Sequence, residues 1–372
     1  MFAYFNDNYT WSSAFLLGLM AGGQLGELDR FLSPLRGQSP TSDAWDKAWT
    51  AMANQQEQLA QEDLRQGYGG SAGARLFRAS MYHFCGERQL PLGERKSKSY
   101  EAAMNAFSRS IELLELPVQR VEIPFQDGNL AAYFVSAQTT QPAPVVIFYS
   151  GLDVVKEMLY GFIRDEFSKR GFHTLIVDTP GVGEALRLLN IASRFDYEVP
   201  TKAVVDYVEK RADVDPQRIG ILGISLGGYY VTRSAAFEKR IKACAAWCGV
   251  WDYGAIWRKR HETQSQMISV PHFQLPWIMG TTSMEEALKR VQPFKLDGVM
   301  QKLDQPLLIL HGEDDKAIPV EDATKAFEAA GSKDKTLKIF TAREGGAEHV
   351  QADEPDAARQ LVADWFVQRF GI

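Results

Sequence analysis

The sequence predicts an α/β protein in which a mostly parallel β-sheet is covered by helices on both faces. Two observations carry this fold class. From Val145 onward, short apolar segments alternate with segments of helical periodicity, which is typical of a parallel sheet that is buried on both faces. Before Pro117 the apolar residues recur at helical spacing, which predicts a separate helical region ahead of the sheet.

The N-terminal helical region is expected to span residues 1–116. Apolar side chains recur at three-and-four spacing in Thr41–Arg65 and again in Lys98–Leu116. The glycine-rich stretch Gly67–Gly73 between them predicts a loop. Tyr82 and His83 are expected on a helix, the first as a packed aromatic and the second as a polar surface residue.

Two strands joined by a tight turn are expected to open the sheet. Arg120–Phe125 and Leu130–Val135 alternate in polarity, and Asp127-Gly128 between them is a typical hairpin turn. The later strands are short and apolar, as parallel strands are. They are expected at residues 145–149, 174–178, 218–222, 241–247, 305–310 and 336–340.

The alternation of strands and helices stops between Gly249 and Leu303. The length and expected helicity of this segment predict a cap inserted at 249–303, over the edge of the sheet where α/β folds bind ligands. The core would then comprise residues 117–248 and 304–372. Such a cap would exclude water and shape the choice of substrate. For any single aromatic residue of the cap, a role in packing alone is an equal alternative. The aromatic and histidine residues concerned are Trp251, Tyr253, Trp257, His272, Phe273 and Trp277.

Composition limits the class of protein and its partners. The 372 residues are 45% hydrophobic and 24% charged, as in soluble globular proteins, and the net charge of -6 argues against a nucleic-acid partner. The apolar segment Trp11–Gly23 is too short to span a bilayer and no positive charge precedes it, so we expect no membrane association and a cytoplasmic location. The three cysteines lack metal-ligand spacing, so no metal is expected. Cys248 lies in an apolar run, which favours a buried thiol over a nucleophile.

The stretch Gly223-Ile-Ser-Leu-Gly227 has the Gly-x-Ser-x-Gly pattern of a nucleophile elbow. An apolar strand precedes it and residues able to start a helix follow, so Ser225 would stand at the tip of a strand–turn–helix. The flanking glycines have a physical reason, because so tight a turn leaves no room for β-carbons. Ser225 is therefore the predicted nucleophile.

A serine nucleophile needs a histidine base and a carboxylate that orients the base. His349 follows the last expected strand and a glycine-rich loop, and it is the predicted base. Three acids follow the preceding strand, and Asp315 is favoured because it lies four residues before Pro319, with Asp314 as the alternative. His311 in the same turn is expected to be structural. The chain order of serine, aspartate and histidine is that of α/β-hydrolases.

Two backbone N–H groups would stabilise the oxyanion of a tetrahedral intermediate. One is expected from Leu226, directly after the nucleophile, and the other from Leu152, in the loop after the 145–149 strand. The neighbouring Asp153 has two open interpretations. It could cap the helix expected from Val155, or it could face the substrate and hold or protonate an oxygen beside the scissile bond.

Four motifs are distributed along the core: Ser150-Gly-Leu-Asp153, Asp178-Thr-Pro-Gly-Val-Gly-Glu184, Val214-Asp-Pro-Gln-Arg-Ile-Gly220 and Gly223-Ile-Ser-Leu-Gly-Gly-Tyr229. With the residues proposed as a triad they resemble the FrsA-like α/β-hydrolases, over nearly the whole chain. This resemblance implies hydrolysis of a C–C bond next to a ketone by a Ser/Asp/His triad, without metal or organic cofactor. It also implies a homodimer, N-terminal helices that help to enclose the site, and a substrate-binding or proton-handling acid at Asp153. Ser150 departs from the family, which usually has glycine there.

The leading hypothesis is a serine hydrolase that cleaves a C–C bond in a ketone-containing small molecule of aromatic or polyketide-like character. An esterase or thioesterase, and an acyltransferase, would use the same acyl-enzyme and remain alternatives. A non-catalytic binding protein on the same fold is a further alternative. The complete set of Ser225, Asp315 and His349 argues against it, since binding alone does not require all three.

Overall fold

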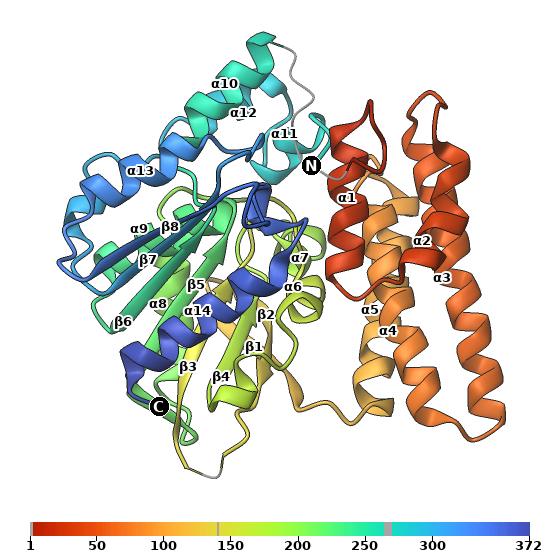
Figure 1. Cartoon of the computed structure of the whole chain (residues 1–372), viewed down its shortest axis with the longest axis horizontal. Coiled ribbons are helices and arrows are strands. Elements are labelled where there is room, and N and C mark those ends of the chain that lie inside the picture. The colour runs from red at the N-terminus through yellow and green to blue at the C-terminus, as the bar shows by residue number, and fades with distance from the viewer. Residues whose placement is uncertain (1–2, 140, 264–269) are drawn as a thin grey trace.

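An eight-stranded β-sheet lies at the centre of the fold, in the order β1-β2-β4-β3-β5-β6-β7-β8 (Figure 1). The computed structural model describes residues 3–139, 141–263 and 270–372. β1 and β2 form the predicted hairpin and β2 runs antiparallel to β4, whereas all other neighbouring strands are parallel. The predicted α/β class with a mostly parallel sheet is confirmed. The strands are β1 (Val118–Phe125), β2 (Gly128–Val135), β3 (Ala143–Tyr149), β4 (His173–Val177), β5 (Val214–Ile224), β6 (Ile241–Trp247), β7 (Leu307–Gly312) and β8 (Lys335–Phe340).

Helices cover both faces of the sheet (Figure 1). The buried apolar side chains of one face belong to the same cluster as those of α6, α14 and the N-terminal helices, and those of the other face pack with α8, α9 and α13. The N-terminal helices therefore continue the core of the sheet instead of enclosing a core of their own. The core helices are α6 (Lys156–Ile163), α7 (Gly183–Arg187), α8 (Glu198–Val208), α9 (Leu226–Phe237), α13 (Val320–Ala329) and α14 (Pro355–Phe370).

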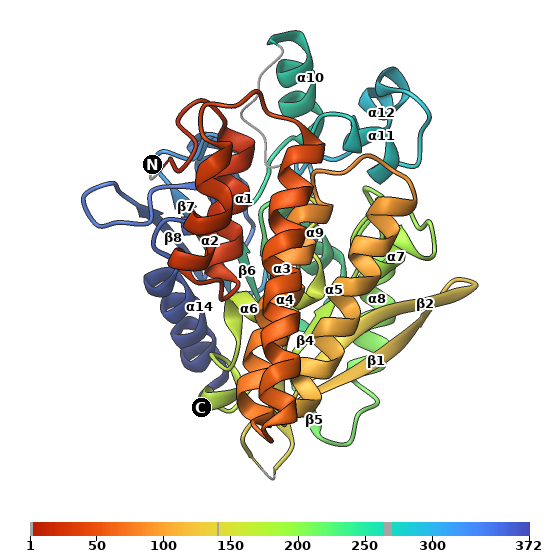
Figure 2. The same ribbon diagram turned by 90° about the vertical axis from the view of Figure 1, so that its right-hand side faces the viewer.

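The first five helices stand side by side against the sheet (Figure 2). Their contact with the core includes an aromatic pair, Phe107 and Tyr133, whose ring centroids are 5.1 Å apart. The division of the chain at residue 116 stays a prediction, although these helices end just before it. They are α1 (Tyr9–Met20), α2 (Leu25–Leu32), α3 (Ser42–Arg65), α4 (Gly69–Glu87) and α5 (Glu94–Leu113).

Two expectations for this region are wrong. The loop predicted at Gly67–Gly73 ends at residue 68, because α4 begins at Gly69. Glycine at 73 serves close packing, since a β-carbon there would lie 2.8 Å from Leu114 Cγ beside α5. His83 is not on the surface: it is 4% exposed, and its Nε2 lies 3.2 Å from Glu57 Oε1. Tyr82 is buried as expected.

Short helices between β6 and β7 lie above the sheet, at the top of Figure 1, where the cap was expected. Tyr253 and Trp257 of α10 are buried, whereas Phe273 is exposed. Residues 264–269 of the expected cap lie outside the described residues, and the cap boundaries stay a prediction. The cap helices are α10 (Tyr253–Thr263), α11 (Gln274–Ile278) and α12 (Met284–Arg290), followed by the 3₁₀ turn Met300–Lys302.

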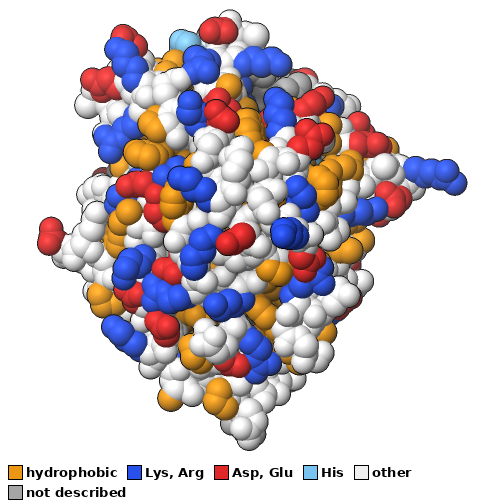
Figure 3. All heavy atoms as spheres, turned by 90° about the vertical axis from the view of Figure 1, so that its left-hand side faces the viewer, with side chains coloured by type: hydrophobic (Ala, Val, Ile, Leu, Met, Phe, Trp, Pro, Cys, Tyr) orange, Lys and Arg blue, Asp and Glu red, His pale blue; other side chains and the backbone are white. Residues whose placement is uncertain are grey.

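Acidic and basic side chains are interspersed on the face drawn in Figure 3. Within the described ranges, every helix is too short or too polar to cross a membrane. The three cysteines, Cys85, Cys244 and Cys248, are buried and unpaired.

Candidate active site

Ser225 stands directly between β5 and α9, with φ 56° and ψ -126°. A positive φ is uncommon for a residue with a side chain, and it is the sharp strand-to-helix turn that a nucleophile elbow requires. The Ser225 N–H donates to Trp247 O (2.8 Å), which ties the turn to β6. A β-carbon at Gly223 would lie 2.1 Å from Gly227 O, so the predicted need for glycine at this turn is met.

His349 connects Ser225 to Asp315. Its Nε2 lies 3.0 Å from Ser225 Oγ and its Nδ1 lies 2.7 Å from Asp315 Oδ2. Asp315 follows β7, and His349 begins the 3₁₀ turn between β8 and α14. The three predicted residues are therefore brought together in one hydrogen-bonded chain. Asp314, the alternative acid, is exposed.

The Asp315 carboxylate is fixed by several donors. Its Oδ1 accepts the N–H groups of Ala317 and Ile318, both at 2.8 Å, and its side chain is fully buried. Burial alone would raise the pKa of Asp315. His349 lowers it through its charge and its hydrogen bond, and His311 and the Ile318 N–H lower it further, so the pKa lies below its ordinary value. Asp315 is thus a carboxylate held in one orientation toward His349.

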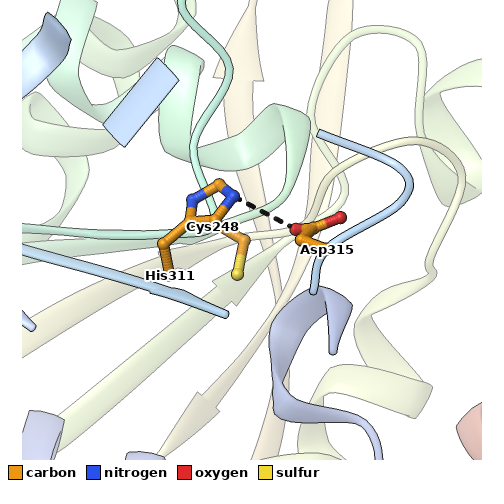
Figure 4. Close-up of side chains that lie close together, drawn as sticks. All are labelled: Cys248, His311 and Asp315. Atoms are coloured by element: carbon orange, nitrogen blue, oxygen red, sulfur yellow. Dashed lines mark ion pairs between the residues drawn. The ribbon is translucent and has the colours of Figure 1, made fainter. Parts of the chain in front are cut away.

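His311 and Cys248 lie beside Asp315 (Figure 4). His311 Nε2 is 3.0 Å from Ile318 O and 3.3 Å from Asp315 Oδ2, and the ring is fully buried, which is consistent with a structural role. Burial, together with the charge of Asp315, raises the pKa of the Cys248 thiol well above its ordinary value, so the thiol stays protonated. Ligand atoms of these three residues lie within 4.8 Å of one another. Both Asp315 oxygens already accept hydrogen bonds, from His349 and from the Ala317 and Ile318 N–H groups, so this carboxylate is engaged within the protein.

The loop after β3 lies directly against the elbow. At Gly151 a β-carbon would be 2.7 Å from Ser225 Cβ and 2.8 Å from Leu226 N, so only glycine allows this approach. Leu226 is the first residue of α9, and its N–H therefore has no acceptor within the helix. Leu152 lines the cavity at Ser225. Both predicted oxyanion residues thus flank Ser225. Within the described part of the chain the buried Ser150 hydroxyl has no hydrogen-bond partner, and nothing there explains the departure from glycine.

Arg88, at the end of α4, holds this loop from the N-terminal helices. Its Nε donates to Asp153 O (3.1 Å) and its Nη2 to Leu152 O (3.3 Å), and the residue is 3% exposed. Arg88 also lines the cavity at Ser225. Sequence analysis missed this residue, because its partners are backbone carbonyls far along the chain and no motif marks such a contact.

Asp153 has a role that neither expectation described. Its carboxylate is fully buried and accepts two hydrogen bonds from Arg187, at 2.6 and 2.8 Å. The helix-cap interpretation is wrong, because the N–H of Lys156 at the start of α6 donates to Asp178 Oδ1 instead. The expected contact with substrate stays a prediction. The neighbours Leu152 and Val154 line the cavity, while the Asp153 side chain lies behind the loop against Arg187.

The surroundings of Asp153 form a buried charged cluster. Arg187 binds Glu87 of α4 through two further hydrogen bonds, of 2.9 and 2.8 Å, and thereby joins the N-terminal helices to the loop. Burial alone would raise the pKa of Asp153, but Arg187, with Lys96 and Arg88 nearby, holds it below its ordinary value. Asp153 is therefore ionised and unsuited to donating a proton. The three cations also offset its negative charge beside the loop.

An apolar cavity opens at Ser225 between α1 and α6. The space between its walls is about 770 Å³, and this figure includes the part that is open to solvent. Its polar wall residues include Tyr9 of α1, which sequence analysis did not single out, and Glu348. The N-terminal helices thus enclose part of the site, as the family resemblance implied. The apolar wall residues on the two helices are Leu16, Leu17, Met20, Met158, Leu159 and Phe162.

A second, smaller pocket lies under the cap helix α10, and Ser225 and His349 line it as well. Its other walls include Leu152 and Leu226, the predicted oxyanion residues, and the turn that carries Asp315. The side chains of α10 that line it are Tyr253, Ile256 and Arg260. Ser225 and His349 thus line both pockets.

Comparison with known proteins adds family relationships to this geometry. The family described as "Esterase FrsA-like" matches residues 38–348. The chain is 28% identical to the 2,6-dihydropseudooxynicotine hydrolase of Paenarthrobacter nicotinovorans, over 97% of this chain and 91% of that protein. It is also 28% identical to the 20-hydroxy-prefusarin hydrolase FUS2 of Gibberella moniliformis, over 99% of this chain and 97% of the relative. The crystal structure of the 2,6-dihydroxy-pseudo-oxynicotine hydrolase matches with a TM-score of 0.79 and 25% identity, over 94% of each chain.

Proposed function

The chain belongs to the FrsA-like esterase family of α/β-hydrolases, and from this premise we propose that it is a serine hydrolase that works through an acyl-enzyme. In this proposal Ser225 is the nucleophile, His349 the general base and Asp315 the carboxylate that orients the base. The observation that carries it is the hydrogen-bonded chain from Ser225 Oγ through His349 to Asp315, with distances of 3.0 and 2.7 Å.

The reaction would begin with attack of Ser225 Oγ on a substrate carbonyl while His349 Nε2 takes the hydroxyl proton. The negative charge that forms on the carbonyl oxygen would be stabilised by the N–H groups of Leu226 and Leu152. Loss of one such donor typically costs about 3 kcal/mol of transition-state stabilisation. Arg88 would keep this loop in place, since it donates hydrogen bonds to the carbonyl oxygens of Leu152 and Asp153.

We propose that the bond cleaved is a C–C bond next to a ketone. The tetrahedral intermediate would collapse with its electron pair leaving on the α-carbon, as an enolate of the second carbonyl group, and His349 would return the proton to that fragment. Water would then hydrolyse the acyl ester to a carboxylic acid. The apolar cavity supports an aromatic or polyketide-like skeleton. Two relatives named as hydrolases of such compounds support the same choice.

An esterase or thioesterase is the second candidate, and the description of the family as an esterase favours it. It would use the same acyl-enzyme with an alkoxide or thiolate as the leaving group. An acyltransferase would differ only in the acceptor that takes the acyl group. The absence of a metal or organic cofactor, a homodimer and a cytoplasmic location stay predictions from the sequence.

A matched pair of substrates tests the proposal. Purified protein would be incubated with 1-phenyl-1,3-butanedione and with phenyl acetate, and the products would be identified by mass spectrometry. We expect the diketone to yield one carboxylic acid and one methyl ketone, with one oxygen of the acid derived from labelled water, and we expect no product with Ser225→Ala. Cleavage of the ester alone would favour the esterase. Equal turnover by Ser225→Ala would overturn the nucleophile.

A further inference from the structure

Helix α10 directs polar side chains into the small pocket beside Ser225. Tyr253, Trp257 and Arg260 are spaced by four and three residues, so they share one face of the helix. All three are buried, with exposed fractions of 3%, 0% and 8%. Tyr253 and Arg260 line the pocket together with Ser225 and His349.

Two polar atoms on this face have no hydrogen-bond acceptor within ordinary distance. The Tyr253 hydroxyl and the Trp257 indole nitrogen are buried and make no hydrogen bond of ordinary geometry among the described residues, although the two groups lie close enough to interact with each other. Burial raises the pKa of Tyr253 to about 12, so its hydroxyl stays protonated at neutral pH and can donate a hydrogen bond. Buried donors in folded proteins are nearly always satisfied by protein groups, water or a ligand, so the Tyr253 hydroxyl is available to a group that enters the pocket.

Arg260 is the charged member of this face. Its Nη2 donates to Ala317 O (2.5 Å), and no carboxylate of the described residues lies within 4 Å of its guanidinium. The carboxylate whose charge acts on it is that of Asp315, which is already engaged by His349 and two backbone N–H groups. A guanidinium has five N–H donors, and an unpaired cation is costly to bury.

We propose that the pocket under α10 is an oxyanion-binding subsite, in which Arg260, assisted by Tyr253, binds a carboxylate or enolate oxygen of the substrate. This inference rests on the proposed function only in assigning the occupant to the substrate of Ser225. The apolar cavity between α1 and α6 would hold the carbon skeleton, and the α10 pocket would hold the oxygenated end. A delocalised oxyanion suits a guanidinium because two parallel N–H donors can reach its two oxygens.

The subsite has a direct consequence for C–C cleavage. When the bond breaks, the electron pair becomes the enolate of the leaving fragment, and its charge develops on an oxygen. A cation already buried beside Ser225 would stabilise that charge without rearrangement. The alternative is that Arg260 only tethers α10 to the turn that carries Asp315, through Ala317 O. A tether would confer no preference for an anionic ligand.

Binding measurements separate these interpretations. In the full-length Ser225→Ala protein, which cannot turn a substrate over, the affinity for 3-phenylpropanoate would be compared with that for 3-phenylpropanamide by calorimetry. We expect the carboxylate to bind about ten-fold more tightly, as for a charge-assisted hydrogen bond. This preference should fall to about unity with Arg260→Gln added and be partly kept with Arg260→Lys. The matched control is Arg258→Gln, which removes the same charge from the exposed face of α10 and should leave the preference unchanged.

A spectroscopic arm identifies the source of the oxyanion. The absorption spectrum of bound 1-phenyl-1,3-butanedione should show the enolate in the Ser225→Ala protein and the neutral form after Arg260→Gln. An enolate signal without a carboxylate preference would also support the subsite and assign it to the leaving fragment. The proposed subsite would be overturned if Arg260→Gln kept both the preference for the carboxylate and the enolate absorption. It would also be overturned if Arg258→Gln lost them as well. If Arg260→Gln does not fold, Tyr253→Phe tests the subsite instead, and we expect it to weaken both the preference for the carboxylate and the enolate absorption. These binding measurements do not depend on turnover. If Ser225 were shown not to be the nucleophile, the results for the subsite would still hold, so the two proposals can fail independently.

Discussion

Ser225 is held in a backbone conformation that a serine rarely adopts. Its φ of 56° costs on the order of 1 to 3 kcal/mol, which the surrounding structure has to offset. The N–H of Ser225 is bound by Trp247 O, and the Gly151 loop packs against its β-carbon. The turn is thus fixed from two neighbouring strands, which keeps the hydroxyl aimed at His349.

Asp315 provides a test of the hydrogen-bonded chain at the level of one residue. Asp315→Asn should lower kcat for ester hydrolysis by about 10³- to 10⁴-fold, because the amide cannot hold His349 in the correct tautomer or stabilise its charge. The measurement is steady-state turnover of a 4-nitrophenyl ester. Asp314→Asn, at the exposed neighbour, is the control and should be close to wild type. A large loss in the control, or none in Asp315→Asn, would contradict the assignment.

The sequence allowed Ser225, Asp315 and His349 to be predicted because each follows the end of a parallel strand. Such strand ends meet at one edge of the sheet, so the residues converge whatever the rest of the chain does. Asp153 and Arg88 could not be assigned in the same way. Asp153 binds Arg187 of α7, and Arg88 binds carbonyl groups of the loop after β3. Each contact joins segments that are far apart in the sequence, so it exists only in the folded chain.

At the level of elements, the docking of the cap on α13 involves a perturbed carboxyl group. Asp322 in the first turn of α13 accepts the N–H of Trp251 (2.9 Å), and burial raises its pKa to about 6. An aspartate in the unfolded chain titrates near 4, so the folded protein loses stability as the pH rises from about 4 to about 6. Asp322→Asn keeps the acceptor and cannot ionise.

The free energy of unfolding of Asp322→Asn, relative to wild type, should therefore be about 1 to 2 kcal/mol higher at pH 7.5 than at pH 4. Urea denaturation at the two pH values measures it. Glu328→Gln, an exposed change on the same helix, should show no such dependence on pH. The same difference at both pH values for Asp322→Asn would show that ionisation of this carboxyl group does not affect stability.

Strands were easier to predict than helix boundaries. The apolar segments before Ser225 and Asp315 form strands close to the expected residues, because burial on both faces leaves a plain signal in sequence. The helix expected from Val155 is short: α6 ends at Ile163, the next residue, Arg164, has φ 44°, and a 3₁₀ turn follows at Ser168–Arg170. No local pattern marks that break. The glycine-rich start of α4 was predicted to be a loop, but at Gly73 it is close packing against Leu114 that requires glycine.

At the level of the whole molecule, the N-terminal helices are part of the site as well as of the core (Figure 2). α1 supplies Tyr9 and an apolar wall of the cavity, and α4 supplies Arg88 to the loop beside Ser225. Helix α10 adds Tyr253, Ile256 and Arg260 in the second pocket at Ser225. The pockets at Ser225 are therefore lined by regions that are far apart in the sequence, which is why their shape could not be predicted from any one motif.

The most direct test of the central claim is the site of covalent labelling in the full-length protein. After reaction with a fluorophosphonate, digestion and mass spectrometry should locate a single adduct on the peptide that contains Ser225, and the adduct should be absent from Ser225→Ala. An adduct on another residue, or equal labelling of the variant, would contradict the assignment of Ser225 as the nucleophile.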